Sequence, residues 1–359
     1  MATTAVAKWA DGHTDSIISV AHNNSTLASG AEDHHICLWS DEGKVHSKLN
    51  LQDDVTGICF QTSNPNILYA ASGNKLNLLD IRDFNHVQSC KEFNSEEINQ
   101  VDINQKETFI VTCDDSGAVK VVDMREMRLF KTLQRHKNIC TSVKFHPTKG
   151  CELISAGTDC IVNSWDFIKG RNLGSLDMHE CQSTEDDSIP AEMYMVNPPL
   201  VYSIDVTHDG SSVICGLENG KVQVLELVGR GKFEPLCDLS GHRRGVSKVE
   251  IFQARSKEFI ISGGNDGRVI LWNGSEQKYN PHTNHKRKSK REGTGGTSSK
   301  PMKDSTAGAS SPSYTAVSQI EHGNKINSLM AVVENKIIIY VVDQTENISL
   351  YDLSKSIGL

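Results

Sequence analysis

Short apolar runs separated by turn residues recur along the whole chain. In one stretch, for example, apolar runs cover Val143–Phe145, Glu152–Ser155 and Ile161–Trp165, and His146-Pro147 and Gly157–Asp159 separate them. Runs of this length, bounded by Gly, Pro or Asp, are typical of β-strands. No segment keeps an apolar period of 3.6 residues over the length of a helix. The pattern predicts an all-β protein.

Three of the four Trp residues end the same pattern. Residues 27–39, 153–165 and 260–272 align without gaps, and in each a Ser is followed four residues later by an Asp and six residues after that by a Trp. A His next to a turn lies upstream of each copy. The equivalent residues are His13, Ser29, Asp33 and Trp39, then His136, Ser155, Asp159 and Trp165, and then His242, Ser262, Asp266 and Trp272. Three copies in one frame indicate an internal repeat.

Weaker copies fill the gaps between the strong ones. Seven comparable strands end near residues 39, 79, 122, 165, 225, 272 and 351. Four of the six intervals are 40 to 47 residues long, the period of a four-stranded propeller blade, and the intervals of 60 and 79 residues carry insertions. In these respects the chain resembles the WD-repeat family of β-propellers, whose Gly-His and Trp-Asp signatures occupy the same positions. The resemblance implies one seven-bladed β-propeller domain over residues 1–359.

The two ends of the chain predict how the ring closes. After Tyr351 only residues 352–359 remain, so the last blade lacks an outer strand. The stretch from Thr4 to Trp9 precedes the first blade's His13 and is a spare strand. We expect it to pair onto the last blade, because this covers both open sheet edges.

The repeated Ser, His and Asp invite comparison with a catalytic triad. A triad is a single constellation with one activated nucleophile, whereas these residues recur in units 1, 4 and 6. In WD-repeat proteins the turn Asp accepts a hydrogen bond from the loop His, which is linked through the Ser to the Trp indole. The resemblance therefore implies structural blade networks and no catalytic residues.

Charge is unevenly placed along the chain. The formal net charge is −8, but residues 286–303 hold seven basic residues against Glu292 alone, so the remainder carries −14. Nucleic-acid affinity comes from clustered Lys and Arg. We therefore expect no nucleic-acid-binding face on the propeller itself.

Several protein classes do not fit the sequence. The longest apolar run, about Ile337–Val342, is far shorter than the roughly 20 residues of a membrane helix. The N-terminus lacks a basic segment followed by an apolar run, which predicts an intracellular protein, nuclear, cytoplasmic or both.

The ten Cys are scattered without a Cys-x-x-Cys pair, so we expect reduced thiols in the core. We also expect a monomer.

Motifs for catalysis and cofactor binding are missing from the sequence. The chain contains neither G-x-x-x-x-G-K-[ST] nor H-E-x-x-H. We therefore expect no enzyme activity and no cofactor. The most metal-like cluster, His34, His35 and Cys37, lies where a turn enters a strand, and successive strand side chains point to opposite faces and cannot converge on one ion. We expect no metal there.

Two consecutive blades end in similar tetrapeptides, Leu79-Asp-Ile-Arg82 and Val122-Asp-Met-Arg125. Residues 67–82 and 109–125 resemble a short sequence motif, here called the box, of the WD-repeat proteins that serve as substrate receptors of cullin-4 RING ubiquitin ligases. The box ends in Trp-Asp-x-Arg. There the final Arg faces the adaptor, damaged-DNA-binding protein 1. The match implies that Arg82 and Arg125 contact this adaptor while Asp80 and Asp123 hold their local turns.

The two boxes also depart from that pattern. Leu79 and Val122 stand where the box has Trp, and the first box has Gly73-Asn74 in place of an Asp turn. The alternative is that Arg82 and Arg125 are exposed strand-end residues with no partner.

Two insertions interrupt the repeat. Residues 173–199 are acidic around Glu185-Asp-Asp187 and predict a long loop between blades 4 and 5. Residues 275–318 are rich in Lys, Gly, Ser and Thr and nearly free of aliphatic residues, which predicts disorder. Their basic run is a candidate nuclear-import signal, with a charged linker and a weak nucleic-acid contact as alternatives. The run comprises Lys286, Arg287, Lys288, Lys290 and Arg291.

These observations predict a non-catalytic protein-interaction module. The resemblance favours a substrate receptor of a cullin-4 ubiquitin ligase that binds the adaptor and an unknown substrate protein. The alternative is a scaffold or a reader of basic peptides in a nuclear complex, which an acidic body would suit. An enzyme would need a single set of convergent polar groups outside the blade repeats, and the sequence shows none.

Overall fold

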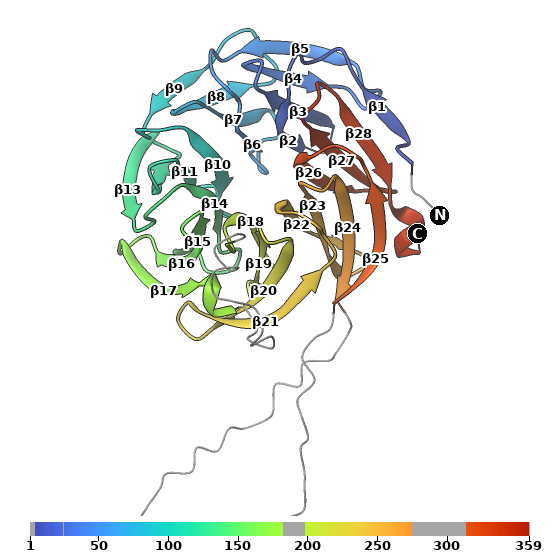
Figure 1. Ribbon diagram of the computed structural model, residues 1–359. Coiled ribbons are helices and arrows are strands. Elements are labelled where there is room, and N and C mark those ends of the chain that lie inside the picture. Colours follow the sequence, from blue (N-terminus) through green and yellow to red (C-terminus); the bar gives the residue numbers. More distant parts are fainter. Residues whose placement is uncertain (1–3, 24, 182–197, 275–313, 359) are drawn as a thin grey trace, which may run out of the picture.

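The computed structural model describes residues 4–23, 25–181, 198–274 and 314–358. These residues form seven antiparallel sheets of four strands. Figure 1 shows the sheets as blades around a central opening, with both chain ends at the seventh blade. The predicted all-β fold and the seven-bladed propeller are therefore confirmed.

The first strand of each blade lies innermost and the fourth lies at the rim (Figure 1). Blade 1 contains β2 (Ile17–Asn23), β3 (Thr26–Ala31), β4 (His35–Trp39) and β5 (Val45–Asn50). Blade 2 contains β6 (Gly57–Phe60), β7 (Ile67–Ser72), β8 (Lys75–Asp80) and β9 (Ser89–Glu92). Blade 3 contains β10 (Ile98–Ile103), β11 (Phe109–Asp114), β12 (Ala118–Asp123) and β13 (Arg128–Gln134). Blade 4 contains β14 (Cys140–Phe145), β15 (Glu152–Gly157), β16 (Ile161–Asp166) and β17 (Arg171–Asp177).

The remaining three blades complete the ring. Blade 5 contains β18 (Val201–Val206), β19 (Ser212–Leu217), β20 (Lys221–Val228) and β21 (Lys232–Ser240). Blade 6 contains β22 (Val246–Ala254), β23 (Lys257–Gly264), β24 (Arg268–Gly274) and β25 (Tyr314–Glu321). Blade 7 contains β26 (Ile326–Val333), β27 (Ile337–Asp343), β28 (Ile348–Asp352) and, from the N-terminus, β1 (Ala7–Trp9). Two 3₁₀ turns, η1 (Met178–Cys181) and η2 (Ser354–Ile357), are the helical segments described, and neither has the length or hydropathy of a membrane span.

The core is divided among the contacts between blades. Seven clusters of buried apolar side chains each join two neighbouring blades, including the pair formed by blades 7 and 1. The second strands are buried on both sides, as in β3, because a blade is covered on each face by the next. The fourth strands alternate, as in β5, because one side meets water. Sheet twist turns each blade onto its neighbour. The place of a strand within its blade therefore determines which of its residues are apolar.

The N-terminal strand closes the ring as predicted. β1 runs antiparallel to β28, with Ala7 opposite Leu350 and Trp9 opposite Ile348. The Trp9 side chain is only 6% exposed, and its ring centroid lies 5.9 Å from that of Trp39 in blade 1. The strand therefore completes blade 7 and contributes a side chain to the core between blades 7 and 1.

A recurring β-bulge joins the innermost strands of successive blades. In six blades the register between the first and second strands shifts at the second residue of the first strand. A bulge re-aims the side chain of the extra residue, and four of the six bulged residues donate a hydrogen bond to a backbone carbonyl of the next blade. These bonds are Asn99 to Cys140 (3.1 Å), Thr141 to Val201 (2.6 Å), Ser247 to Ile326 (2.6 Å) and Asn327 to Ile17 (3.0 Å).

Two insertion boundaries differ from the expectation. Strand β17 includes residues 173–177 of the loop predicted at 173–199, and β25 includes residues 314–318 of the segment predicted at 275–318. In both places the fourth strand of a blade is amphipathic and partly polar, so composition does not separate it from a loop. Residues 182–197 and 275–313, with the basic run 286–291, lie outside the described residues.

The cysteines are all unpaired thiols, but not all lie in the core. Cys90 and Cys151 are exposed, contrary to the expectation of core positions. Burial raises the pKa of the Cys37 thiol to about 12.

Replacing Trp9 by Ala will test the closure. We expect Trp9→Ala to lower the free energy of unfolding by about 3–5 kcal/mol, because it removes a buried aromatic side chain from the contact between blades 7 and 1. Urea unfolding followed by Trp fluorescence and circular dichroism measures the change. The control is Lys8→Ala on the exposed side of the same strand, for which we expect a change within about 0.5 kcal/mol. Equal effects of the two substitutions would contradict the closure role.

Candidate functional site

The alternation of strand direction gives the propeller two distinct faces. Turns between first and second strands, and between third and fourth strands, lie on one face, which carries Arg82 and Arg125 and is here called the arginine face. Connections between blades, and turns between second and third strands, lie on the opposite face. That face carries His13, His136 and His242 and is called the histidine face.

Arg82 is held by Asp80 in the turn after β8. The Arg82 guanidinium donates from Nε to Asp80 Oδ1 (2.9 Å) and from Nη2 to Oδ2 (2.5 Å), while the backbone N–H of Arg82 also bonds Oδ1 (3.0 Å). These bonds from Arg82 lower the pKa of Asp80 to about 2. The Arg82 side chain is nevertheless 65% exposed. Asp80 therefore holds both the turn and the arginine that was predicted as an adaptor contact.

Arg125 occupies the equivalent turn in blade 3 but is held differently. Asp123 Oδ1 accepts the backbone N–H groups of Arg125 (2.9 Å) and Glu126 (3.1 Å). Within the described residues the exposed Arg125 guanidinium has no ion pair. Both arginines thus lie on one face in adjacent blades. The Arg82 guanidinium is bonded to Asp80, whereas that of Arg125 has no ion pair with the described residues.

Leu79 and Val122, which replace Trp in the two boxes, are both fully buried. Leu79 packs between blades 1 and 2, and Val122 packs between blades 2 and 3. The departure from Trp therefore changes the core behind each arginine and leaves the turn in place.

The three predicted blade networks have the same geometry. The His Nδ1 lies 3.0 Å from an Asp oxygen in each copy, the His Nε2 lies 2.7 or 2.8 Å from the Ser hydroxyl, and the Trp indole N–H donates to that hydroxyl over 2.7 to 2.9 Å. An indole only donates and a carboxylate only accepts. Burial lowers the pKa of His13 and His242, so in these two networks we assign the ring proton to Nδ1, and the Ser donates its proton to Nε2.

These contacts match a Ser-His-Asp triad in connectivity but not in accessibility. Ser29, Ser155 and Ser262 are all 0% exposed, so no substrate reaches their hydroxyls. Burial would raise the pKa of Asp33, but hydrogen bonds from His13 and the Thr14 N–H bring it down to about 2. The networks join the histidine-face loops to the blades and hold an ionised Asp in place.

Alignment of the repeats within the sequence did not find two further networks. In blade 3 the Asn94 amide donates to Asp114 (2.8 Å) and accepts from Thr112 (2.9 Å). In blade 7 the ring nitrogens of His322 lie 2.8 Å from Asp343 and 2.8 Å from the Tyr351 hydroxyl. Asp114 lies eight residues before Val122, and Asp343 lies eight residues before Tyr351. In the three predicted networks the Asp lies six residues before the Trp. A search that allowed this shift, without requiring Trp, would have found them.

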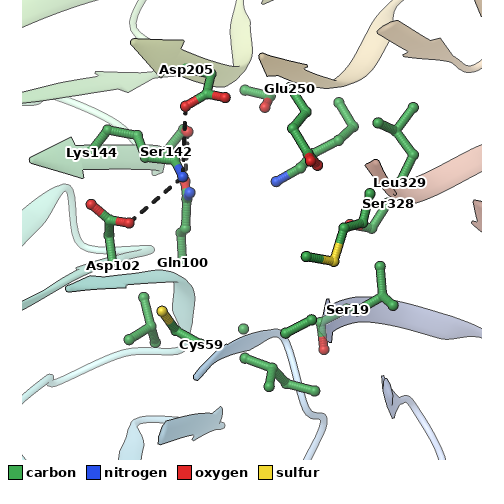
Figure 2. Close-up of a pocket in the computed structure, with 18 of the residues that line it drawn as sticks. Ser19, Cys59, Gln100, Asp102, Ser142, Lys144, Asp205, Glu250, Ser328 and Leu329 are labelled. Carbon is green, nitrogen blue, oxygen red and sulfur yellow. Dashed lines mark hydrogen bonds and ion pairs between the residues drawn. The ribbon is translucent and has the colours of Figure 1, made fainter. Parts of the chain in front are cut away.

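The central channel has a volume of about 600 Å³ and is lined by the first strands of the seven blades. Figure 2 shows Lys144 between Asp102 and Asp205, with Nζ distances of 3.6 and 3.7 Å. Burial opposes the charge on Lys144, but these two carboxylates raise its pKa above the ordinary value. Sequence analysis did not find this cluster, because its members come from three different blades.

The channel carboxylates also accept hydrogen bonds from backbone N–H groups at the inner edges of neighbouring blades. Asp102 accepts the N–H of Phe145 (2.8 Å), Asp205 that of Ile251 (2.8 Å) and Glu250 that of Ala331 (3.0 Å), each in the first strand of the next blade. These edge groups have no neighbouring strand, so a side chain must satisfy them. Burial raises the pKa of Glu250 to about 7. The channel is therefore a charged lining whose acids also hold blades together.

Acidic side chains gather on the histidine face of blades 1 to 3. Burial and repulsion from Asp15 and Asp54 raise the pKa of Glu32. Burial and repulsion from Asp115, Asp54 and other neighbouring acids raise that of Glu97. This group is a concentrated negative surface on the face opposite Arg82.

The rejected metal cluster does not converge in the structure. His35 Nδ1 faces the Asp33 carbonyl (2.6 Å), and the Cys37 thiol faces the Gly12 carbonyl (3.3 Å). His34 instead lies 3.1 Å from Asp54 and forms a group with Asp53 whose ligand atoms lie within 4.8 Å of one another. This group belongs to the acidic surface of the histidine face.

Comparison with protein-family models identifies three repeats described as "WD domain, G-beta repeat" at residues 6–40, 127–166 and 233–273. Each match begins at a fourth strand and ends in the third strand of the next blade, and each contains one of the three Trp networks. The repeat is therefore offset from the blade by one strand, which is why β1 belongs to blade 7. Three stretches of the chain thus match WD repeats, and all three lie in the seven-bladed ring.

Similar curated proteins include relatives with WD repeats in different roles. WD repeat-containing protein 53 homolog of Dictyostelium discoideum is 26% identical over 74% of this chain and 77% of its own length. A p21-activated protein kinase-interacting protein 1-like protein of Xenopus laevis is 19% identical over 72% of this chain and 64% of its own length. The target of rapamycin complex subunit wat1 of Schizosaccharomyces pombe is 23% identical over 70% and 76%.

Removing one network hydroxyl will show whether these contacts stabilise the blades. We expect Ser155→Ala to lower the free energy of unfolding by about 1–3 kcal/mol, because it leaves the Trp165 indole N–H buried without a partner and removes one of the two partners of His136 Nε2, the other being the Asn163 amide. Urea unfolding measures the change. The half-exposed Ser47→Ala in β5 is the control, and an equally small change in both variants would contradict the structural role.

The Glu250 carboxyl predicts a pH dependence of stability. Its pKa is about 7 in the folded chain and about 4.3 when unfolded. Between these values the folded state holds a proton that the unfolded state has lost, so stability falls as pH rises. We expect Glu250→Gln to raise the melting temperature relative to wild type at about pH 8, with the difference gone near pH 5. Exposed Glu234→Gln is the control, and a difference independent of pH would contradict the assignment.

Proposed function

We propose that this propeller is a substrate receptor of a cullin-4 RING ubiquitin ligase and that Arg82 and Arg125 contact the adaptor, damaged-DNA-binding protein 1. The observation that carries the proposal is the repetition of one exposed Asp-x-Arg turn at equivalent positions of adjacent blades. A planar guanidinium bonds two acceptors at once, which suits an interface contact. The fixed Arg82 loses little conformational freedom on binding.

In this role the protein performs no bond chemistry. The arginine face of blades 2 and 3 would hold the adaptor, and other surfaces would present the unidentified substrate. Tethering raises the substrate concentration near the ubiquitin-conjugating enzyme. The proposed location is the nucleus, the cytoplasm or both, with residues 286–291 as the candidate import signal.

A reader of basic peptides is the second candidate. It is favoured by the acidic surface around Glu32 and Glu97, whose raised pKa values reflect burial and mutual repulsion. A cationic peptide would relieve that repulsion. This candidate depends on the histidine face, so substitution of Glu32 and Glu97, rather than of the two arginines, would abolish binding.

Recovery of the adaptor from cells tests the proposal. We expect tagged wild type to co-purify damaged-DNA-binding protein 1 and the double variant Arg82→Ala, Arg125→Ala to recover it at least about tenfold less, because interface arginines are frequent hot spots. The matched control is Arg243→Ala, Arg244→Ala, which removes two exposed arginines from the histidine face. Equal melting temperatures will show that folding is intact. Failure of the wild type to recover the adaptor would overturn the proposal.

A further inference from the structure

An exposed aromatic surface lies between blades 3 and 4, at the rim of the arginine face. Phe130 in β13 is 39% exposed, and Ile168 in the turn after β16 is 43% exposed. Phe167, which precedes Ile168, has its ring centroid 6.5 Å from that of Phe130. Two large apolar side chains thus reach solvent from neighbouring segments.

A rigid aromatic base supports this surface. The ring of Phe109 lies 4.9 Å from Phe130 and 5.2 Å from Phe167, and Phe145 lies 5.5 Å from Phe167. Phe167 is fully buried and Phe145 nearly so. Phe130 is therefore held in place from below while its other side faces water, as a preorganised contact residue does.

Positive charge surrounds the apolar side chains. Lys131 Nζ lies 5.7 Å from the Phe130 ring centroid, and its stem lies beside Gly170. Lys169 lies 3.1 Å and Arg171 4.0 Å from Asp166. Two cations thus share one carboxylate, and a third lies at the neighbouring phenyl ring, in a chain whose net charge is −8.

We infer that this surface, defined by Phe130, Lys131, Ile168, Lys169 and Arg171, docks an acidic peptide segment that carries a large apolar side chain. The apolar side chain would cover Phe130 and Ile168, which water now contacts. Acidic residues beside it would pair with the cations, two of which now share Asp166. A basic or purely polar peptide would lack one of these two contributions.

Charge complementarity favours a peptide over a nucleic acid. The three cations form a small cluster beside an exposed phenyl ring on a protein with a net charge of −8, whereas nucleic-acid affinity needs an extended basic surface. The inference is independent of the adaptor proposal, because neither Arg82 nor Arg125 belongs to this surface.

Fluorescence anisotropy of a labelled synthetic peptide tests the inference. The probe places a central Phe-Leu pair between Asp and Glu residues, and two comparison peptides replace either the Phe-Leu pair by Ser or the acids by Lys. We expect the full-length protein to bind the probe at least about tenfold more tightly than either comparison peptide, with affinity falling as salt rises.

Two variants assign the binding to this surface. Phe130→Ser, Ile168→Ser should weaken probe binding about tenfold or more, and Lys131→Glu, Lys169→Glu should do the same and remove most of the salt dependence. The charge variant leaves the aromatic base untouched, so it remains informative if the apolar variant unfolds. The control, Val317→Ser, removes a side chain that is 38% exposed on the outer strand of blade 6.

Three results would overturn the inference: no saturable probe binding, equal binding of all three peptides, or full affinity in the charge variant. Tighter binding of a single-stranded oligonucleotide than of the probe would assign the surface to nucleic acid instead. The adaptor proposal fails separately, since it depends on recovery of the adaptor by the arginine turns.

Discussion

Coverage of each sheet by its two neighbours is the constraint on which this molecule depends. A four-stranded antiparallel sheet with two apolar faces cannot stand alone in water, and the ring gives every face a partner only if the last contact, between blades 7 and 1, is made. The one-strand offset of the repeat meets this need, because β1 pairs with β28 while Trp9 packs against blade 1. The same constraint explains why the core consists of seven similar layers.

Hydrogen bonds between polar groups fix the orientation of each blade relative to the next. The bulges direct side chains such as Asn99 and Thr141 to a carbonyl of the next blade, and the channel acids bond the edge N–H groups of the following strand. The Trp networks act further from the channel, where they join histidine-face loops to the second and third strands. Apolar contact alone would tolerate small rotations between blades, whereas directional hydrogen bonds at both positions select one arrangement.

The sequence was sufficient for the fold because Trp39, Trp165 and Trp272 lie in one frame and the anchors recur at blade length. It failed where the same role is filled by other residues: Asn94 replaces His in blade 3, and Tyr351 replaces Trp in blade 7. It also could not show the pairing of Lys144 with Asp102 and Asp205, because contacts between blades have no local sequence signature. Of the candidate site, the sequence predicted Arg82 and Arg125 as equivalent residues at the strand ends of adjacent blades. It did not show that Asp80 holds the Arg82 guanidinium, whereas that of Arg125 has no ion pair within the described residues.

The distribution of charge argues that the two faces serve different partners. The acids around Glu32 and Glu97 repel one another on the histidine face, while Arg82, Arg125 and the cations beside Phe130 lie on the opposite face and its rim. The histidine face also carries Arg243 and Arg244, so its acidic surface is confined to blades 1 to 3. A basic partner would be attracted there, whereas the proposed acidic peptide would be attracted to the cations beside Phe130. The closed ring keeps these surfaces at a fixed separation, and this geometry would suit the proposed receptor, which has to hold an adaptor and a substrate at the same time.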